Sequence, residues 1–125
     1  MNVVTACAAP LRWGSMSGDY TPAEVAALLA QEDVQLIDVR TLHEHEAGRI
    51  DGDRLIELGD LPAHAAPIVR DRSVIVYCRS GGRSAMATEA LTQAGFDAHN
   101  MVGGMLAWEA AGLPMVPDDA RVIEP

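Results

Sequence analysis

Lysine is absent from this 125-residue sequence, whose nine basic residues are all arginine and are outnumbered by 18 acidic residues. The formal net charge is −9 at pH 7, and the sequence pI is near 4.6. An acidic chain lacks the basic face that phosphate binding requires, which argues against nucleic acid as a partner. Against this background, Arg79 and Arg83 lie only four positions apart and predict a local positive site.

Cysteine is also scarce, since Cys7 and Cys78 are the only two in the chain. They lie far apart and form neither a disulfide framework nor a metal-ligand spacing. This usage is typical of a reducing compartment, so we expect a cytoplasmic protein. Long apolar runs are missing as well, and because none could span a bilayer we expect no association with a membrane.

The histidines do not form a metal-binding pattern. His45, with its acidic neighbours, is the exception, and the other histidines share no metal-ligand spacing with an acidic residue on one helix face. We expect all of them to lie on the surface or to be satisfied by hydrogen bonds, and none to act as a general base for Cys78. The four are His43, His45, His64 and His99.

The most informative stretch is residues 73–84, S-V-I-V-Y-C-R-S-G-G-R-S. Residues 74–77 predict a strand buried on both faces of a parallel sheet, with Cys78 at its carboxyl end. The two glycines allow a tight turn with inward N–H groups, and Arg83 begins an alanine-rich helix whose first N–H groups lack partners. These surroundings lower a cysteine pKa, so we predict a reactive thiolate rather than a small buried core residue.

Four motifs follow one another in a specific order. L-I-D-V-R occupies residues 36–40, Y-C-R-S-G-G-R-S residues 77–84, A-L-T-Q-A-G-F residues 90–96 and V-G-G-M-L-A-W-E-A-A-G-L-P residues 102–114. Each motif alone is a weak signal, whereas the set is specific. Together they resemble the rhodanese (thiosulfate sulfurtransferase-like) domain in its single-domain form, over roughly residues 20–114.

The resemblance implies a sulfurtransferase without a metal or an organic cofactor. Cys78 would attack the sulfane sulfur of thiosulfate or a related donor, sulfite would leave, and a thiophilic acceptor such as cyanide or a thiol would remove the sulfur from the resulting persulfide. The residues implied to bind the substrate, through N–H groups and two guanidinium groups, are Arg79, Ser80, Gly81, Gly82, Arg83 and Ser84. The residues implied to support this loop from neighbouring segments are Asp38, Arg40, Gly103 and Gly104. An ordinary ion pair at a strand end is the alternative for Asp38 and Arg40.

After Gly48 the sequence departs from the family. A histidine, isoleucine, proline, glycine and alanine are usual there, whereas residues 49–53 are R-I-D-G-D. This departure leaves open the rigidity of the loop and the path of the next short strand, around residues 55–57.

Two other functions stay open on the same scaffold. One is a module that relays sulfur between proteins or only binds a partner. The other is a cysteine phosphatase or arsenate reductase. Only four residues separate Cys78 from Arg83, one fewer than in cysteine phosphatases. The shorter loop predicts a ring of N–H groups too small for a phosphoryl group.

The alternation of strand and helix patterns predicts an α/β fold, a three-layer rhodanese-like domain with about five mostly parallel strands flanked by helices. Capping boxes predict helix starts at Thr21 and Thr41. We also expect a helix over residues 61–69, broken near Pro67, and a core position for Trp108.

The length of the chain fits one domain with its own core. We expect this domain over residues 19–116. Residues 1–18 lack periodicity and predict a flexible N-terminal extension, which contains Cys7. Residues 117–125 are acidic and predict a frayed C-terminal tail.

Overall fold

A computed structural model describes residues 18–31, 33–61 and 63–125. Its centre is a parallel sheet of four strands in the order β4-β3-β5-β6. The strands are β3 (Val34–Asp38), β4 (Arg54–Leu55), β5 (Ser73–Tyr77) and β6 (Ala98–Asn100). Apart from residue 18, the predicted N-terminal extension with Cys7 lies outside the described residues.

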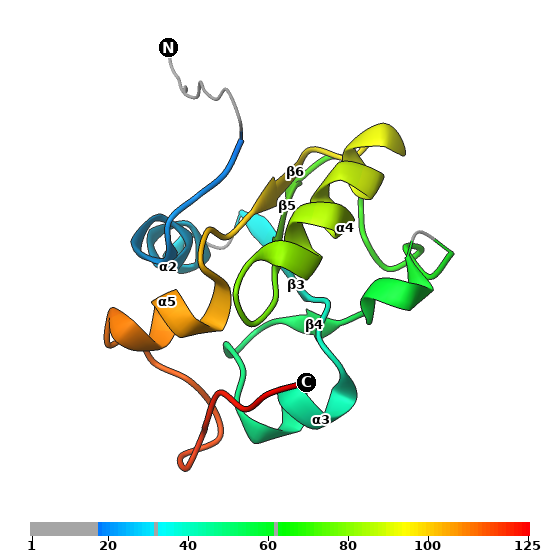
Figure 1. The fold of residues 1–125 in the computed structure, drawn as a ribbon. Coiled ribbons are helices and arrows are strands. Elements are labelled where there is room, and N and C mark those ends of the chain that lie inside the picture. The colour runs from blue at the N-terminus through cyan, green and yellow to red at the C-terminus, as the bar shows by residue number, and fades with distance from the viewer. Residues whose placement is uncertain (1–17, 32, 62) are drawn as a thin grey trace.

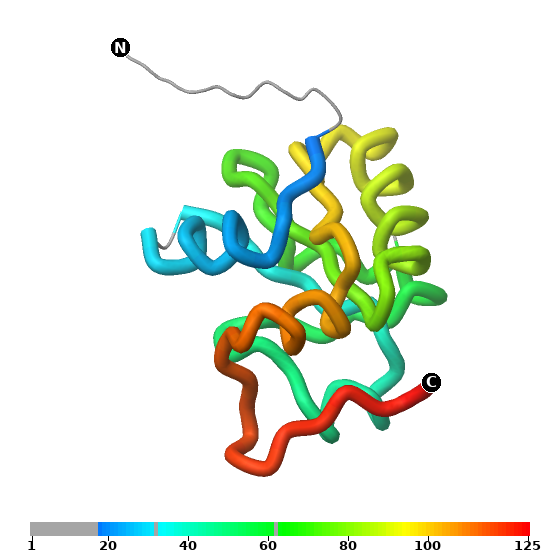
Figure 2. The backbone as a smooth tube through the Cα atoms, turned by 60° about the vertical axis from the view of Figure 1, so that its left-hand side comes forward, coloured from blue at the N-terminus to red at the C-terminus, as the bar shows by residue number. Residues whose placement is uncertain are grey.

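Helices cover both faces of this sheet. They are α2 (Pro22–Ala30), α3 (Leu42–Ala47), α4 (Gly82–Gln93) and α5 (Gly104–Ala110), together with the short 3-10 helix η2 (Leu58–Asp60). α4 lies on one face, and α2 and α5 lie on the other (Figures 1 and 2). The predicted three-layer α/β architecture is therefore confirmed. Within the described ranges, none of the helices combines the length and apolar character needed to cross a bilayer.

The sheet has four strands in the described part of the chain, where about five were expected. The fifth position is taken by a single residue, because Tyr20 forms a parallel bridge with Met101 beside the end of β6. The N–H of Tyr20 donates to the carbonyl of Asn100, and the N–H of Val102 donates to the carbonyl of Tyr20. This pairing ties the start of α2 to the edge of the sheet.

The alternation of side chains along β5 builds two cores. Val74 and Val76 point toward α4, whereas Ile75 and Tyr77 point toward α2 and α5, as the twofold period of a strand requires. All four are fully buried. β5 is thus the central strand predicted to be buried on both faces, and the second core also holds Trp108, as expected.

Both predicted capping boxes are present. Thr21 and Glu24 at α2, and Thr41 and Glu44 at α3, bond reciprocally through side chain and backbone. Each box satisfies N–H groups that a helix start leaves without partners. The starts of these two helices were therefore correctly predicted from local sequence.

The helix expected over residues 61–69 is wrong. The described residues there form turns after η2, and Ala65 and Ile68 still contribute to the core. Pro67 lies inside this span, where it lacks the N–H that a helix would bond and its ring would clash with the preceding turn. The segment buries its apolar residues without helical structure.

The C-terminal segment also differs from expectation, since it is docked rather than frayed. The N–H of Arg121 donates to the carbonyl of Ala47 at 2.8 Å, and Val122 packs against the core below α5. The antiparallel bridge between Arg49 and Val116 holds the chain just before this segment. The last residues therefore brace α3 (Figure 1).

Candidate active site around Cys78

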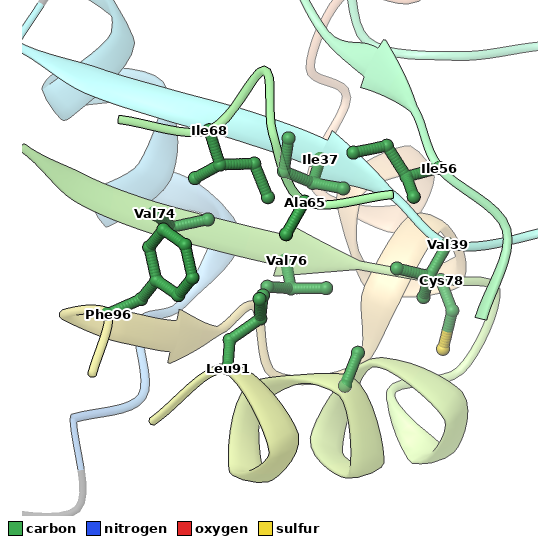
Figure 3. Close-up of a cluster of buried hydrophobic side chains, with 11 residues drawn as sticks. Ile37, Val39, Ile56, Ala65, Ile68, Val74, Val76, Cys78, Leu91 and Phe96 are labelled. Atoms are coloured by element: carbon green, nitrogen blue, oxygen red, sulfur yellow. The ribbon is translucent and has the colours of Figure 1, made fainter. Parts of the chain in front are cut away.

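Cys78 lies directly after β5, at the carboxyl edge of the sheet, and is only 1% exposed. Its side chain closes one end of the core between the sheet and α4 (Figure 3). The residues of the loop that follows turn sharply into α4, so the start of this helix faces the sulfur. This location matches the edge at which parallel α/β sheets bind ligands.

Hydrogen-bond donors from the loop converge on the sulfur. The N–H of Gly81 donates to Cys78 Sγ at 3.0 Å, and the N–H and hydroxyl of Ser84 lie at 3.4 Å from it. Gly81 has φ +107°, a left-handed conformation that favours glycine, and it caps α4. N–H groups at two of the predicted loop positions, together with the hydroxyl of Ser84, therefore converge on Sγ itself.

Two opposing effects determine the pKa of Cys78. Burial of the thiol raises it, but hydrogen bonds from the hydroxyl and N–H of Ser84 and from the N–H groups of Gly81 and Ser80 outweigh burial. The pKa of Cys78 consequently lies below its ordinary value. A thiolate is the nucleophilic form of cysteine, so the site favours the reactive state.

Two other predicted substrate-binding residues face outward. Ser80 and Gly82 are exposed, and a side chain added at Gly82 would meet nothing within 4 Å. Gly82 is also the first residue of α4, where N–H groups have no carbonyl partner within the helix. The outer side of the loop is thus open to a small molecule.

Arg83 does not point freely at the loop, as an unpaired anion-binding group would. Its Nη1 and Nη2 donate to Oε2 and Oε1 of Glu44, each at 2.8 Å. Glu44 is completely buried, and the side chain of Arg83 is 27% exposed. The hydrogen bonds to Glu44 are the main reason that the pKa of Arg83 is raised. The charge of Cys78 raises this pKa to a smaller extent, so Arg83 interacts with the thiolate as well as with Glu44.

Glu44 was not singled out from the sequence as a site residue. Burial raises its pKa, but hydrogen bonds from Arg83 and from Thr41 lower it to about 2. The same carboxylate therefore caps α3 and anchors the first turn of α4. Its capping role was predictable from the spacing to Thr41, whereas its pairing with a residue 39 positions later has no local signal.

Arg79 is the less constrained of the two arginines. Within the described part of the chain its Nε atom is buried and has no hydrogen-bond partner. Its carbonyl, in contrast, accepts from the N–H of Leu106 at 3.0 Å. The backbone of Arg79 is thus fixed, while its side chain retains an unused donor beside the sulfur loop.

Gly103 and Gly104 lie against the cysteine loop, as predicted. A Cβ atom at Gly104 would lie 2.5 Å from the carbonyl oxygen of Cys78 and 2.6 Å from that of Arg79. Gly104 also has φ +58°. This close approach lets the N–H of Met105 donate to the carbonyl of Cys78 at 2.9 Å. The start of α5 therefore packs against the backbone of the cysteine loop and donates a hydrogen bond to it.

Asp38 and Arg40 form a buried ion pair at the end of β3. Nη2 of Arg40 lies 2.7 Å from Oδ2 of Asp38, and it also donates to the carbonyl of Gly48. The hydrogen bonds of this pair are made away from the cysteine loop, and the Arg40 guanidinium lies over the ring of Tyr77 at 5.4 Å from its centroid. The pair thus contacts Tyr77, the residue before Cys78, and its support of the loop stays a prediction.

Residues 49–53, the segment with the unusual sequence, are also anchored at Tyr77. The hydroxyl of Tyr77 donates to Asp53 at 2.6 Å and accepts from the N–H of Ile50. Burial raises the pKa of Asp53, and burial together with the charges of Asp38 and Asp53 raises that of Tyr77. The altered loop is therefore held by Tyr77.

Among the residues that the structure describes, one group of side chains has the composition of a metal site. Ligand atoms of Asp38, His45 and Asp53 lie within 4.8 Å of one another. Arg40 already occupies both oxygens of Asp38, His45 Nδ1 lies 2.9 Å from Oδ2, and Tyr77 donates to Asp53. Arg40 thus supplies the positive charge that this cluster needs, and His45 is a satisfied histidine, as expected.

Comparisons with known proteins agree with this geometry. The family profile described as "Rhodanese-like domain" matches residues 21–111. A protein named "Sulfurtransferase" from Allochromatium vinosum is 41% identical over 86 residues, which cover 68% of this chain and 80% of that protein. "Thiosulfate sulfurtransferase GlpE" from Pseudoalteromonas translucida is 33% identical over 90 residues, covering 71% and 86%. A crystal structure of a rhodanese-related protein from Thermoplasma volcanium matches with a TM-score of 0.74 and 28% identity, covering 78% of this chain and 96% of that one.

Proposed function

This chain belongs to the rhodanese-like domain family, and we propose that it is a sulfurtransferase that carries a sulfane sulfur as a persulfide on Cys78. The donor is thiosulfate or a related compound, and the acceptor is cyanide or a thiol. The observation that carries the proposal is the convergence of N–H and hydroxyl donors on the buried Sγ atom. The reaction belongs in a reducing compartment such as the cytoplasm, where Cys78 stays free.

In the first step the Cys78 thiolate attacks the outer sulfur of thiosulfate. A bond forms between Sγ and that sulfur, the S–S bond of the donor breaks, and its electron pair leaves with sulfite. Covalent catalysis of this kind splits a transfer into two easier steps. Sulfite is a stable anion, so its departure needs no general acid.

In the second step the nucleophilic acceptor attacks the outer sulfur of the persulfide. The S–S bond to Cys78 breaks, and the cysteine leaves as a thiolate that is again stabilised by Gly81 and Ser84. Cyanide would yield thiocyanate, and a thiol would yield a new persulfide. The donor and the acceptor thus use the same open face of the loop, which predicts ping-pong kinetics.

Arg79 is the better candidate for binding the anionic donor. Its Nε is unpartnered within the described ranges, whereas the guanidinium of Arg83 already binds Glu44. The participation of Arg83 in donor binding remains a prediction, and its contact with Glu44 supports a role in positioning the start of α4. The N–H groups of Gly81 and Ser84, in contrast, are held in place before the reaction and need no rearrangement during it.

The surface around the loop favours a protein as one acceptor. Four of the five large exposed apolar residues of the described chain come from segments that flank the loop: Leu42, Met86, Val102 and Leu106. Met86 lies one helical turn after Arg83, and the N–H of Leu106 binds the carbonyl of Arg79. A protein that approaches the loop would bury these side chains, which makes them the candidate contact surface for a protein acceptor. Transfer of sulfur to a protein thiol is therefore the second candidate function.

The test is steady-state transfer of sulfur from thiosulfate to cyanide, followed as thiocyanate. We expect turnover by the wild type, parallel double-reciprocal lines at different cyanide concentrations, and no turnover by Cys78→Ser. A wild-type protein that reacts with a thiol-specific alkylating agent yet forms no thiocyanate would count against thiosulfate as the donor. Met86→Glu should slow transfer to protein thiols while leaving transfer to cyanide unchanged, if a protein is the acceptor.

A further inference from the structure

The hydroxyl of Ser84 has one proton and three acceptors within reach. Its oxygen lies 3.4 Å from Cys78 Sγ and 3.2 Å from the carbonyl oxygen of Gly81, and it lies nearest of all to Oδ1 of Asn100. A hydroxyl donates only one hydrogen bond at a time. The donor that lowers the pKa of Cys78 most is thus also a donor that Asn100 can occupy.

The orientation of the Asn100 amide is defined by its other end. Nδ2 of Asn100 donates to the carbonyl of Gly81 at 3.4 Å, which directs Oδ1 toward the hydroxyl of Ser84. Asn100 is 8% exposed and ends β6, where its own carbonyl accepts from the N–H of Tyr20. The amide is therefore held as an acceptor, opposite the sulfur.

We propose that Asn100 is a positioning residue that holds the hydroxyl proton of Ser84 when the sulfur is neutral and releases it to Cys78 when the sulfur is charged. A hydrogen bond to a charged acceptor is about twice as strong as one to a neutral acceptor, so the proton follows the charge. When the negative charge moves outward onto a persulfide, the hydroxyl returns to Asn100. This inference rests on Cys78 as the reacting group of the proposed function, and it is independent of the donor.

The competition has a chemical benefit. Each donor that binds the sulfur increases the thiolate fraction but reduces the nucleophilicity of the thiolate, and the best attacking thiol has a pKa near the ambient pH. A hydroxyl shared with Asn100 stabilises the thiolate less than an unshared one. Asn100 thereby keeps the thiolate reactive.

The charged groups around this site stay unchanged in the variants that test the inference. α4 contributes Arg83, whose partner Glu44 comes from α3, and the cysteine loop contributes Arg79. The Asp38–Arg40 ion pair lies at the end of β3. Beside Asn100, a groove of about 460 Å³ is lined by Asp19 and Glu89. A change in thiol titration on replacing Asn100 by an uncharged residue therefore reports on hydrogen bonding.

The experiment is a titration of the Cys78 thiolate by its ultraviolet absorbance, with the pH dependence of alkylation as a second readout, in a Cys7→Ser background. Asn100→Leu removes the competing acceptor, so its titration midpoint should fall, with about tenfold more thiolate at a fixed pH below the midpoint. Ser84→Ala should raise the midpoint. The double variant should titrate like Ser84→Ala, because Asn100 acts only through the hydroxyl.

Thr88→Val is the matched control. Thr88 lies one turn further along α4 and lines the same groove, and its hydroxyl donates to the backbone carbonyl of Ser84. This variant should titrate like the wild type. A purely structural role for Asn100 predicts an unchanged or raised midpoint in Asn100→Leu, and either result would overturn the inference. A lowered midpoint that persists in the Ser84→Ala background would overturn it as well.

A second variant covers the case in which Asn100→Leu does not fold. Asn100→Asp supplies a stronger acceptor and should raise the midpoint more when Ser84 is present than when it is replaced by alanine. The part that remains with alanine is the direct repulsion between two negative charges. Equal increases in the two backgrounds would contradict a role for the hydroxyl, whether or not the protein transfers sulfur.

Discussion

The guanidinium of Arg83 and the carboxylate of Glu44 form two hydrogen bonds of 2.8 Å that join the first turn of α4 to the first turn of α3. The carboxylate is fully buried and also binds the backbone N–H of Thr41. A single side chain therefore caps one helix and anchors the other. Since α4 presents the donors to Cys78, this contact links the stability of the domain to its reactive site.

The first prediction concerns stability in acid. The pKa of Glu44 falls from an ordinary 4.5 to about 2 in the folded protein, so the native state favours the ionised form. Its contribution of about 3 kcal/mol to the free energy of unfolding is complete above about pH 5 and is lost as the pH falls toward 2. When the free energy of unfolding is measured in urea from pH 2 to pH 6, it should change less with pH in Glu44→Gln than in the wild type.

Glu46→Gln is the control for this experiment, because Glu46 is an exposed carboxylate of the same helix. Its pH dependence should follow that of the wild type. If Glu44→Gln and the wild type lose stability in parallel between pH 5 and pH 2, then the ionised Glu44 carboxylate, with its bonds to Arg83 and Thr41, does not carry this energy.

The second prediction separates the two arginines near the sulfur. Arg79→Ala removes a donor that has no hydrogen-bond partner in the part of the chain that the structure describes, so kcat/KM for thiosulfate should fall about 10- to 100-fold with little change in stability. Arg83→Ala leaves a buried carboxylate unpaired and should lower the free energy of unfolding by about 2 kcal/mol. This is less than for a fully buried pair because Arg83 contacts solvent. Steady-state kinetics and urea unfolding of both variants test these two roles. A loss of activity without a loss of stability in Arg83→Ala, and the opposite in Arg79→Ala, would assign donor binding to Arg83.

The third prediction concerns the contact between α5 and the cysteine loop. Gly104→Ala would force a Cβ atom into the carbonyl groups of Cys78 and Arg79, so it should destabilise the protein and reduce alkylation of Cys78. Gly112→Ala is the control, since φ is +73° there but nothing lies within 4 Å of the added atom. The control should cost only about 1 kcal/mol of backbone strain and leave alkylation unchanged. Equal effects of the two substitutions would show that the close approach does not matter.

Local signals in the sequence were sufficient for much of the architecture. The capping boxes at Thr21 and Thr41 and the apolar run before Cys78 each depend on residues within a few positions of one another. The donor ring also belongs to this class, because Gly81 and Ser84 follow Cys78 within six residues. Such features are formed by residues that are close in the sequence, so they can be predicted from a single short segment.

Other features depend on how distant elements pack. The pairing of Arg83 with Glu44 spans 39 residues, and that of Ser84 with Asn100 spans 16. Neither follows from spacing, because α3 and β6 reach the cysteine loop only through the assembled sheet. The missing helix over residues 61–69 has a local cause instead, since Pro67 in its interior outweighed its apolar pattern.

The fourth prediction is that this protein is a poor phosphatase. The N–H groups of Gly81 and Ser84 converge on Sγ itself, and Arg83 is bound to Glu44 rather than free to hold a phosphoryl oxygen. Hydrolysis of an aryl phosphate should therefore be far slower than sulfur transfer from thiosulfate. A variant with one glycine inserted after Gly81 tests whether loop length limits hydrolysis. Comparable wild-type rates for both substrates, with hydrolysis abolished by Cys78→Ser, would favour a phosphatase.

The central claim is that Cys78 carries the transferred sulfur, and intact-protein mass spectrometry after incubation with thiosulfate tests it most directly. We predict that the wild type and Cys7→Ser gain the mass of one sulfur atom and lose it when cyanide is added. Cys78→Ser should gain no mass. Two results would contradict the account. One is a wild-type protein that gains no mass although its Cys78 still reacts with an alkylating agent. The other is a gain of one sulfur atom by Cys78→Ser.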